Sequence, residues 1–529
     1  MSYRKSVGTG GVWIASDRWP DAYDLATWAR DSFRLERART PQQRAIALYK
    51  WTLICMGRNG PAPREGERGR EGYLMDTLKY LTVYGGHYCD GLSRLMINAW
   101  QAAGAGRGRK VVICRLGHTV AELRYRDADG RARWHVFDPQ HGWYVFARDG
   151  GHVASLAEIN AEPDLLLDPK DPPRPWFYAW SRHERYRDRE QSVAHPAYGR
   201  SPAPKHRMRL DLRRGERWTR LWSPGPQYWP YAYGPKPMPI THVWVEQDVR
   251  GGGIADGYLG EHVEPYLYRT PRRTWLLHAE ERTPRCRMPG TVELRYAVPL
   301  ADGGFREGAA NCIDLAGEKR ASTKAATLHP AKAGRLGQIV YEVNTPYVIT
   351  DARIDALVRT GLDEQDVLAF YVSTDGGASW EQVWGNMYAE RKRATGGPRR
   401  ASIAFGNEAH RAGKFSVVGK YSYQVRVDFL ASRRVETVGL DELVLTTNGL
   451  CGMMVLPALQ PGSNRVSVAV RKPPARSLRL HLEYEWSERG RGARRFSTRL
   501  PATGGIAIVR VSGCRPRDVR MRAVSLELV

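Results

Sequence analysis

The stretch Tyr84-Gly85-Gly86-His87-Tyr88-Cys89-Asp90-Gly91-Leu92-Ser93 places one cysteine where a loop rich in glycine gives way to a predicted helix. After Cys89 the apolar side chains recur at the spacing of a buried helix face. They are Leu92, Leu95, Met96, Ala99, Trp100 and Ala103, and Gly104 follows them. Unpaired N–H groups at a helix start favour thiolate over thiol and can receive a developing oxyanion. Cys89 is therefore a candidate nucleophile.

Three short strands are predicted downstream of this helix, over Lys110–Arg115, His118–Tyr125 and Arg133–Asp138. The last two are joined by the turn sequence Arg-Asp-Ala-Asp-Gly at residues 126–130, which suits a short antiparallel hairpin. A hairpin folded about Ala128 places His118 opposite Asp138, and another loop type would move this pairing by a residue or two. A carboxylate beside an imidazole fixes its tautomer and stabilises the imidazolium, so this pair supplies a base and an orienting acid for Cys89.

Each of these residues also has an ordinary structural explanation, because cysteine is a common core residue and an aspartate before a proline often ends a strand. Their order along the chain is more specific than any member alone. A zinc site is the competing interpretation, because His87-x-Cys89 and Cys114-x3-His118 supply four residues of ligand type. That interpretation takes Cys114 out of an apolar strand and leaves Asp138 without a role. We favour catalysis without a metal or an organic cofactor.

Three blocks of sequence, in this order, resemble the transglutaminase-like superfamily. They are Gly86 to Ser93 with Ala99 to Gly104 behind it, Gly117 to Glu122, and Trp134 to Pro139. The resemblance covers residues 40 to 165 and implies a papain-like fold with Cys89 as nucleophile, His118 as base and Asp138 as orienting carboxylate. It also implies thioester chemistry on a glutamine carboxamide or a peptide carbonyl, resolved by an amine or by water.

Asp90 follows the cysteine at a position where the cross-linking animal enzymes of this superfamily carry an aromatic residue. A carboxylate beside a thiol opposes its ionisation, so hydrolysis and amidation stay open beside cross-linking. The second donor of an oxyanion hole also stays open, with Tyr84 and His87 as the neighbouring side chains.

The chain of 529 residues is long enough for about three or four domains. Helices are predicted over Asp21–Glu36, Pro41–Met56 and Thr77–Leu81, the second with a capping box between Thr40 and Gln43. We predict an α+β, papain-like, transglutaminase-like domain over residues 1–171, followed by a linker rich in proline and aromatic residues over 172–240. All-β domains are expected over residues 241–345, 346–450 and 451–529, the last two as β-sandwiches.

The β prediction rests on short segments in which apolar and polar residues alternate. They are residues 291–296, 369–372, 421–429, 478–486 and 506–511. Among them, residues 373–380 resemble the Asp-box, S-x-D-x-G-x-x-W, and a single copy argues against a propeller. We interpret Ser373, Asp375 and Trp380 as the architecture of a hairpin turn.

Composition narrows the range of partners. The net charge of +25 is spread along the chain as arginine without a nucleic-acid motif, so no specific nucleic-acid binding is predicted. No transmembrane segment and no signal peptide is predicted, because apolar runs of the required length are missing. Seven cysteines, an odd number without close pairs, do not form a disulfide framework. The compartment stays open, although several β domains favour an extracellular or cell-envelope location.

The favoured function is acyl transfer or hydrolysis by Cys89 on protein or peptide amides, with the β domains positioning the substrate. Two alternatives remain. One is a non-enzymatic envelope or extracellular protein that binds glycan or protein through its β-sandwiches. The other is a glycan-processing enzyme, suggested by the Asp-box and by the aromatic residues of segment 172–237.

Overall fold

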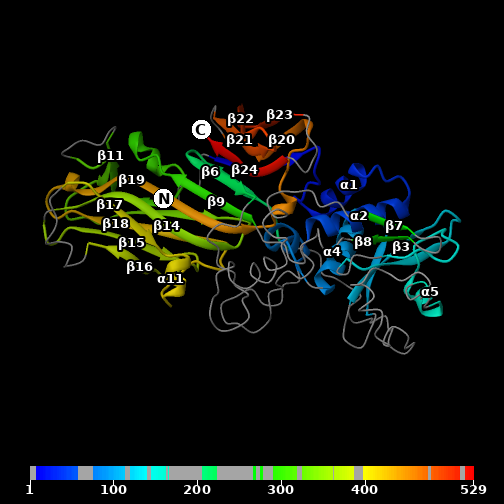
Figure 1. Ribbon diagram of the computed structural model, residues 1–529. Coiled ribbons are helices and arrows are strands. Elements are labelled where there is room, and N and C mark those ends of the chain that lie inside the picture. The colour runs from blue at the N-terminus through cyan, green and yellow to red at the C-terminus, as the bar shows by residue number, and fades with distance from the viewer. Residues whose placement is uncertain are drawn as a thin grey trace.

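The computed structural model describes residues 8–56, 76–87, 89–112, 119–139, 144–162, 165, 205–222, 266–269, 274–277, 290–318, 325–361, 363–386, 397–474, 478–512 and 519–529. Within these ranges the chain is mostly β-sheet. Helices α1, α2 and α4 gather with a small sheet at one end of the molecule, and the larger sheets occupy the other end (Figure 1). The protein is therefore a multidomain chain rich in β-sheet.

Four helices follow the predicted pattern. They are α1 (Leu25–Leu35), α2 (Pro41–Cys55), α3 (Thr77–Lys79) and α4 (Cys89–Ala102). A further short helix, α5 (Leu156–Ala161), was not predicted. The predicted capping box is present, because the Gln43 N–H donates to Thr40 Oγ1 at 3.2 Å and the Gln43 side chain accepts from the Thr40 N–H at 3.1 Å. After α3 a π-helical turn, η1 (Tyr80–Tyr84), ends at Gly85, whose φ of 65° is left-handed.

The three strands predicted after α4 form an antiparallel sheet in the order β2-β3-β4. Their bounds are β2 (Arg107–Val112), β3 (Thr119–Arg126) and β4 (Ala132–Phe137). The hairpin register is a correction to the prediction, because Arg126 pairs with Ala132 and the turn is centred on Asp129 and not on Ala128. The Asp127 N–H donates to the Arg131 carbonyl at 3.0 Å, so the loop between the paired residues Arg126 and Ala132 is closed by this hydrogen bond.

This register pairs Ala121 with Phe137. Continued by one residue it places Val120 opposite Asp138, so the register differs by two residues from a hairpin folded about Ala128. Because side chains alternate between faces with a period of two, a displacement of two does not change which residues of β3 and β4 share a face of the sheet.

The remaining β structure comprises two large sheets, a four-stranded sheet and a short hairpin. The ten-stranded sheet contains β11 (Leu315–Gly317), β12 (Leu328–Pro330), β19 (Val438–Cys451), β9 (Gly290–Ala297), β6 (Glu216–Leu221), β24 (Val519–Leu528), β21 (Arg479–Glu488) and β22 (Gly492–Pro501), with β14 (Ile349–Thr360) on β19 and β17 (Arg399–Ala404) on β14. The five-stranded sheet is β10 (Ala309–Ile313), β13 (Gly337–Asn344), β18 (Ser422–Leu430), β15 (Val367–Ser373) and β16 (Glu381–Gly385). The four-stranded sheet is β23 (Gly504–Val511), β20 (Gly462–Lys472), β1 (Gly8–Ser16) and β5 (Leu210–Arg213). The hairpin is β7 (Tyr266–Arg269) with β8 (Thr274–Leu277).

Short helical turns complete the described part of the chain. They are η5 (Ala301–Arg306), α11 (Asn407–Arg411), η6 (Val435–Thr437) and η7 (Met453–Val455). None of the helices in the described residues is long and apolar enough to cross a membrane.

Strand pairing crosses the predicted domain boundaries. The first strand, β1, lies in the range 1–171 but pairs with β20 in the range 451–529. Strands β5 and β6 lie in the predicted linker 172–240, and β6 joins β24 to β9 and so connects two parts of the ten-stranded sheet. Strand β13 of the range 241–345 pairs with β18 of the range 346–450. The linker residues 172–204 and 223–240 lie outside the described residues.

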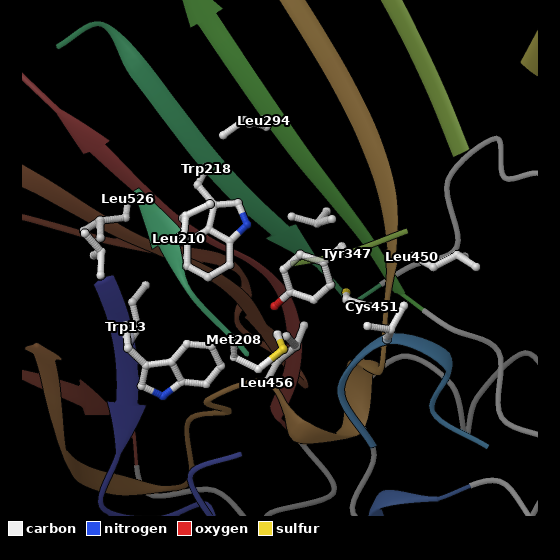
Figure 2. Close-up of a cluster of buried hydrophobic side chains, with 14 of the residues drawn as sticks. Trp13, Met208, Leu210, Trp218, Leu294, Tyr347, Leu450, Cys451, Leu456 and Leu526 are labelled. Atoms are coloured by element: carbon white, nitrogen blue, oxygen red, sulfur yellow. The ribbon is translucent and has the colours of Figure 1, made fainter. Parts of the chain in front are cut away.

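Aromatic side chains fill the space between the sheets. Between the five- and ten-stranded sheets, Tyr423 shares a hydrogen bond of 2.7 Å with Thr447 and its ring packs against Phe405. A second cluster, drawn in Figure 2, brings Trp13 of β1 to the same core as Trp218 of β6. The N-terminal strand is therefore part of the core that the C-terminal strands build.

The Asp-box residues form the turn between β15 and β16, as predicted. The Ser373 hydroxyl donates to the Asp375 carboxylate at 2.7 Å and accepts from the Gly377 N–H at 2.9 Å. The Asp375 carboxylate accepts from the Ser379 N–H at 2.9 Å. The Trp380 ring is partly exposed and carries the guanidinium of Arg426 at 4.7 Å.

One carboxyl group links β1 to the segment before α1 and predicts a pH dependence. Asp21 accepts hydrogen bonds from the Trp13 indole and from the Tyr23 N–H, and burial raises the pKa of Asp21 from 3.8 to about 6. A pKa that is higher in the folded state means that the ionised carboxylate destabilises the fold. That penalty is fully present above pH 6 and is lost as the pH falls toward 4.

We therefore expect Asp21→Asn to stabilise the protein at pH 8 by up to about 3 kcal/mol and to have little effect near pH 4. Urea unfolding of both proteins across this pH range measures the difference. Glu364→Gln, at an exposed carboxylate, is the control and should show no such trend. A difference that does not grow with pH contradicts the assignment.

Candidate active site

Cys89 is the first residue of α4 and is partly exposed, whereas Cys55 and Cys451 are buried. The following turn of α4 is tied to the small sheet, because the Ser93 hydroxyl donates to the carbonyl of Thr119 at 3.1 Å. Thr119 is the first residue of β3 and follows His118 in the sequence. The start of α4 and the start of β3 are thus held together.

Of the other two predicted catalytic residues, Asp138 and His118, the structure describes only Asp138. Asp138 is completely buried and directly follows β4, the neighbour of β3. His118 lies outside the described residues, as does Cys114 of the zinc alternative. No group of three or more histidine, cysteine, aspartate or glutamate side chains within the described ranges is arranged to hold a metal ion.

Asp90, the acid beside the cysteine, is held by two cations. The Arg94 Nε donates to Asp90 Oδ2 at 2.7 Å, and the Lys110 ammonium pairs with Asp90 Oδ1. Burial lowers the pKa of Lys110, while the Asp90 carboxylate acts in the opposite direction, and the charge of Cys89 is also felt at Lys110. One carboxylate between two cations leaves a net positive charge of one beside the thiol.

His87 packs against the first turn of α4. A Cβ atom at position 91 would lie 2.1 Å from His87 Cγ, so only glycine at position 91 lets the imidazole lie this close to the helix. On its other side the ring packs against Tyr80 of η1, with ring centroids 4.2 Å apart. His87 and Tyr84 are both 1% exposed, so these two side chains are part of the packing in front of the helix.

The turn before the cysteine is fixed by a segment of the β region. The Gly452 N–H donates to the Thr82 carbonyl of η1 at 2.8 Å. One carbonyl further along this segment contacts the helices, since Met454 O accepts from the Trp19 indole at 2.8 Å and from the Cys55 thiol at 3.5 Å. The segment that ends β19 therefore holds both η1 and α2.

Sequence reasoning found Cys89 as the helix start but missed its charge environment. The ion pair of Arg94 with Asp90 could have been predicted, because a spacing of four residues is that of a helical ion pair. The contact of Lys110 with Asp90 could not, because it depends on the register of β2 with β3, in which Lys110 pairs with Ala121.

The comparisons with known proteins identify no family. No protein-family model matches the chain, and no curated protein matches its sequence. Among solved structures, a Bacteroides uniformis beta-glucuronidase is 9% identical over 37% of this chain and 22% of its own, with a TM-score of 0.14. A Paenibacillus xanthan lyase is 10% identical over 50% of this chain and 30% of its own, with a TM-score of 0.15. The chain thus covers less than a third of either structure, and likeness at these scores defines neither its fold nor its function.

The charges around Cys89 predict opposite effects for two substitutions. Lys110→Met leaves Asp90 with one cation and should slow alkylation of Cys89 by iodoacetamide, whereas Asp90→Asn leaves two cations unopposed and should accelerate it. Each change is expected to be about tenfold at pH 7, the effect of one pKa unit on the thiolate fraction. Alkylation of Cys312 in the same samples is the internal reference, because its thiol is also partly exposed but burial raises its pKa. Equal rates in both variants contradict the charge effect.

The close contact of Gly452 with η1 predicts that adding one methyl group at position 452 destabilises the protein. A Cβ at position 452 would lie 2.3 Å from the Leu81 carbonyl oxygen, although the backbone φ of −66° suits alanine. Gly452→Ala should therefore destabilise the protein by about 1–3 kcal/mol through crowding alone, measured by urea unfolding. Gly151→Ala, where the nearest atom would be 3.4 Å away, is the matched control and should be close to neutral.

Proposed function

We propose that this protein is a transglutaminase-like cysteine enzyme that forms a thioester acyl-enzyme on protein or peptide amides. Cys89 is the nucleophile, His118 the base and Asp138 the carboxylate that orients it. The observation that carries the proposal is the place of Cys89 as the first residue of α4, partly exposed and beside a net positive charge. These conditions favour the thiolate.

The surroundings of α4 support a papain-like arrangement for this part of the chain. The helix that begins with the cysteine packs against an antiparallel sheet whose central strand, β3, begins one residue after His118. Asp138 follows the neighbouring strand β4 and is shielded from water, where a carboxylate interacts strongly with an imidazolium.

The reaction follows from these roles. The Cys89 thiolate attacks the amide carbon, the carbonyl electrons move to the oxygen, and N–H groups at the start of α4 receive the oxyanion. Collapse of the intermediate expels the amine or ammonia, which takes its proton from the His118 imidazolium, and leaves a thioester on Cys89. A second amine or water then attacks the thioester while His118 removes its proton. The β domains position the protein or peptide substrate.

The thioester is the species to test for. Incubation with a glutaminyl peptide should increase the mass of the peptide fragment carrying Cys89 by that of the acyl group, and added hydroxylamine should remove it. Cys89→Ala should abolish the adduct, and His118→Ala and Asp138→Asn should slow its formation by about a hundredfold or more. Absence of an adduct, together with Cys89 alkylation no faster than that of Cys312, supports a non-enzymatic binding protein instead.

A further inference from the structure

Arg220 is a buried cation on β6, a strand of the ten-stranded sheet. It lies on β6 two residues after Trp218, so both side chains leave the same face of the strand. The side chain is 1% exposed, and its guanidinium lies 4.3 Å from the ring of Trp218 and 5.6 Å from that of Trp13 on β1. Arginine stays protonated in proteins, so this site carries a full positive charge.

The other buried basic side chains are paired with carboxylates. Of the four buried lysine and arginine residues in the described part of the chain, Arg94 and Lys110 share Asp90, and Arg359 bonds to Asp441 at 2.9 Å. Arg220 is the exception, because no carboxylate among the described residues forms an ion pair with it. The Tyr347 hydroxyl lies close to the guanidinium, but none of the three guanidinium nitrogens makes a hydrogen bond of good geometry within the described residues.

The groups that face Arg220 do not cancel its charge. The positive charge of the guanidinium acts to lower the pKa of three neighbouring groups, Tyr347, Tyr484 and Cys451. Burial has the larger effect and raises the pKa of each, that of Cys451 to about 12. These three groups are therefore neutral at physiological pH. Both rings beside Arg220 are tryptophans, which attract a cation but neutralise nothing.

A second donor in the same place also lacks an acceptor. The indole N–H of Trp218 is buried and has no hydrogen-bond partner within the described ranges. Figure 2 shows that this nitrogen is on the side of the ring that faces Tyr347. Several N–H donors without acceptors, one of them charged, thus lie together inside an apolar core, and buried donors of this kind require an acceptor.

We propose that Arg220 and the Trp218 indole form a sealed site for one small monovalent inorganic anion, with chloride as the physiological occupant. The charge of the site favours a monovalent anion, because one negative charge neutralises the guanidinium whereas a phosphate dianion would leave a net buried charge. The burial decides the size, because all of Trp13, Trp218 and Tyr347 are 6% exposed or less. The anion is a structural ligand that enters during folding and joins β6 to the strands around it.

Crystals of the native protein grown in sodium bromide test the site directly. We expect an anomalous bromide peak within hydrogen-bonding distance of the Arg220 guanidinium and the Trp218 Nε1. A carboxylate of the chain itself bound to the guanidinium, or a guanidinium with no ion beside it, would overturn the proposal. This experiment needs no variant, so it holds even if substitution of Arg220 impairs folding.

Unfolding measured at constant ionic strength gives an independent readout. As chloride replaces gluconate, whose anion is too large for a sealed site, the folded-to-unfolded ratio of the native protein should rise tenfold per tenfold increase in chloride above saturation. Arg220→Met should lose this dependence. The control Arg359→Met breaks a buried ion pair and should be less stable but keep the chloride dependence. An equal dependence in Arg220→Met and in the native protein contradicts the site.

Discussion

The hydrogen bond from the Gly452 N–H to the Thr82 carbonyl connects the β region to the turn that leads into Cys89. A π-helical turn that ends at Gly85 leaves its carbonyls without the next helical N–H groups, and a buried carbonyl needs a donor. The β region supplies that donor at the end of β19. The bond requires two backbones to approach closely, and Gly85 Cα lies near the position that a Cβ of residue 452 would take. The geometry in front of the candidate nucleophile therefore depends on a residue more than 350 positions away in the sequence.

Local features of the fold were predictable because local chemistry determines them. The capping box of Thr40 and Gln43, the Asp76 cap on α3 and the start of α4 at Cys89 all depend on residues within one helical turn. The β segments were predictable for the same reason, since alternation of apolar and polar residues identifies a half-buried strand. The five segments named from the sequence coincide with β9, β15, β18, β21 and β23.

The partners of those strands were not predictable. The strand β1 was not predicted, and its sequence does not indicate that it pairs with β20, more than 440 residues further on. Such pairings join ranges that lie far apart in the sequence, because a strand with an apolar face is stabilised wherever a core accepts it. The hairpin of β3 and β4 shows the limit at short range. Its turn residues were recognised, but the strands pair in a register that differs by two from the predicted one, with a hydrogen bond from the Asp127 N–H to the Arg131 carbonyl in the turn.

The charge at the candidate site shows why register matters for function. From the sequence alone, Asp90 is an acid beside a thiol and opposes its ionisation. In the folded chain Asp90 lies between Arg94 and Lys110, so the same carboxylate orients two cations near the thiol. Lys110 reaches this place because β2 pairs with β3 in a register that turns Lys110 toward α4; a slip by one residue would turn it to the opposite face of the sheet. The net charge beside Cys89 therefore depends on strand pairing and not only on the residue next to it.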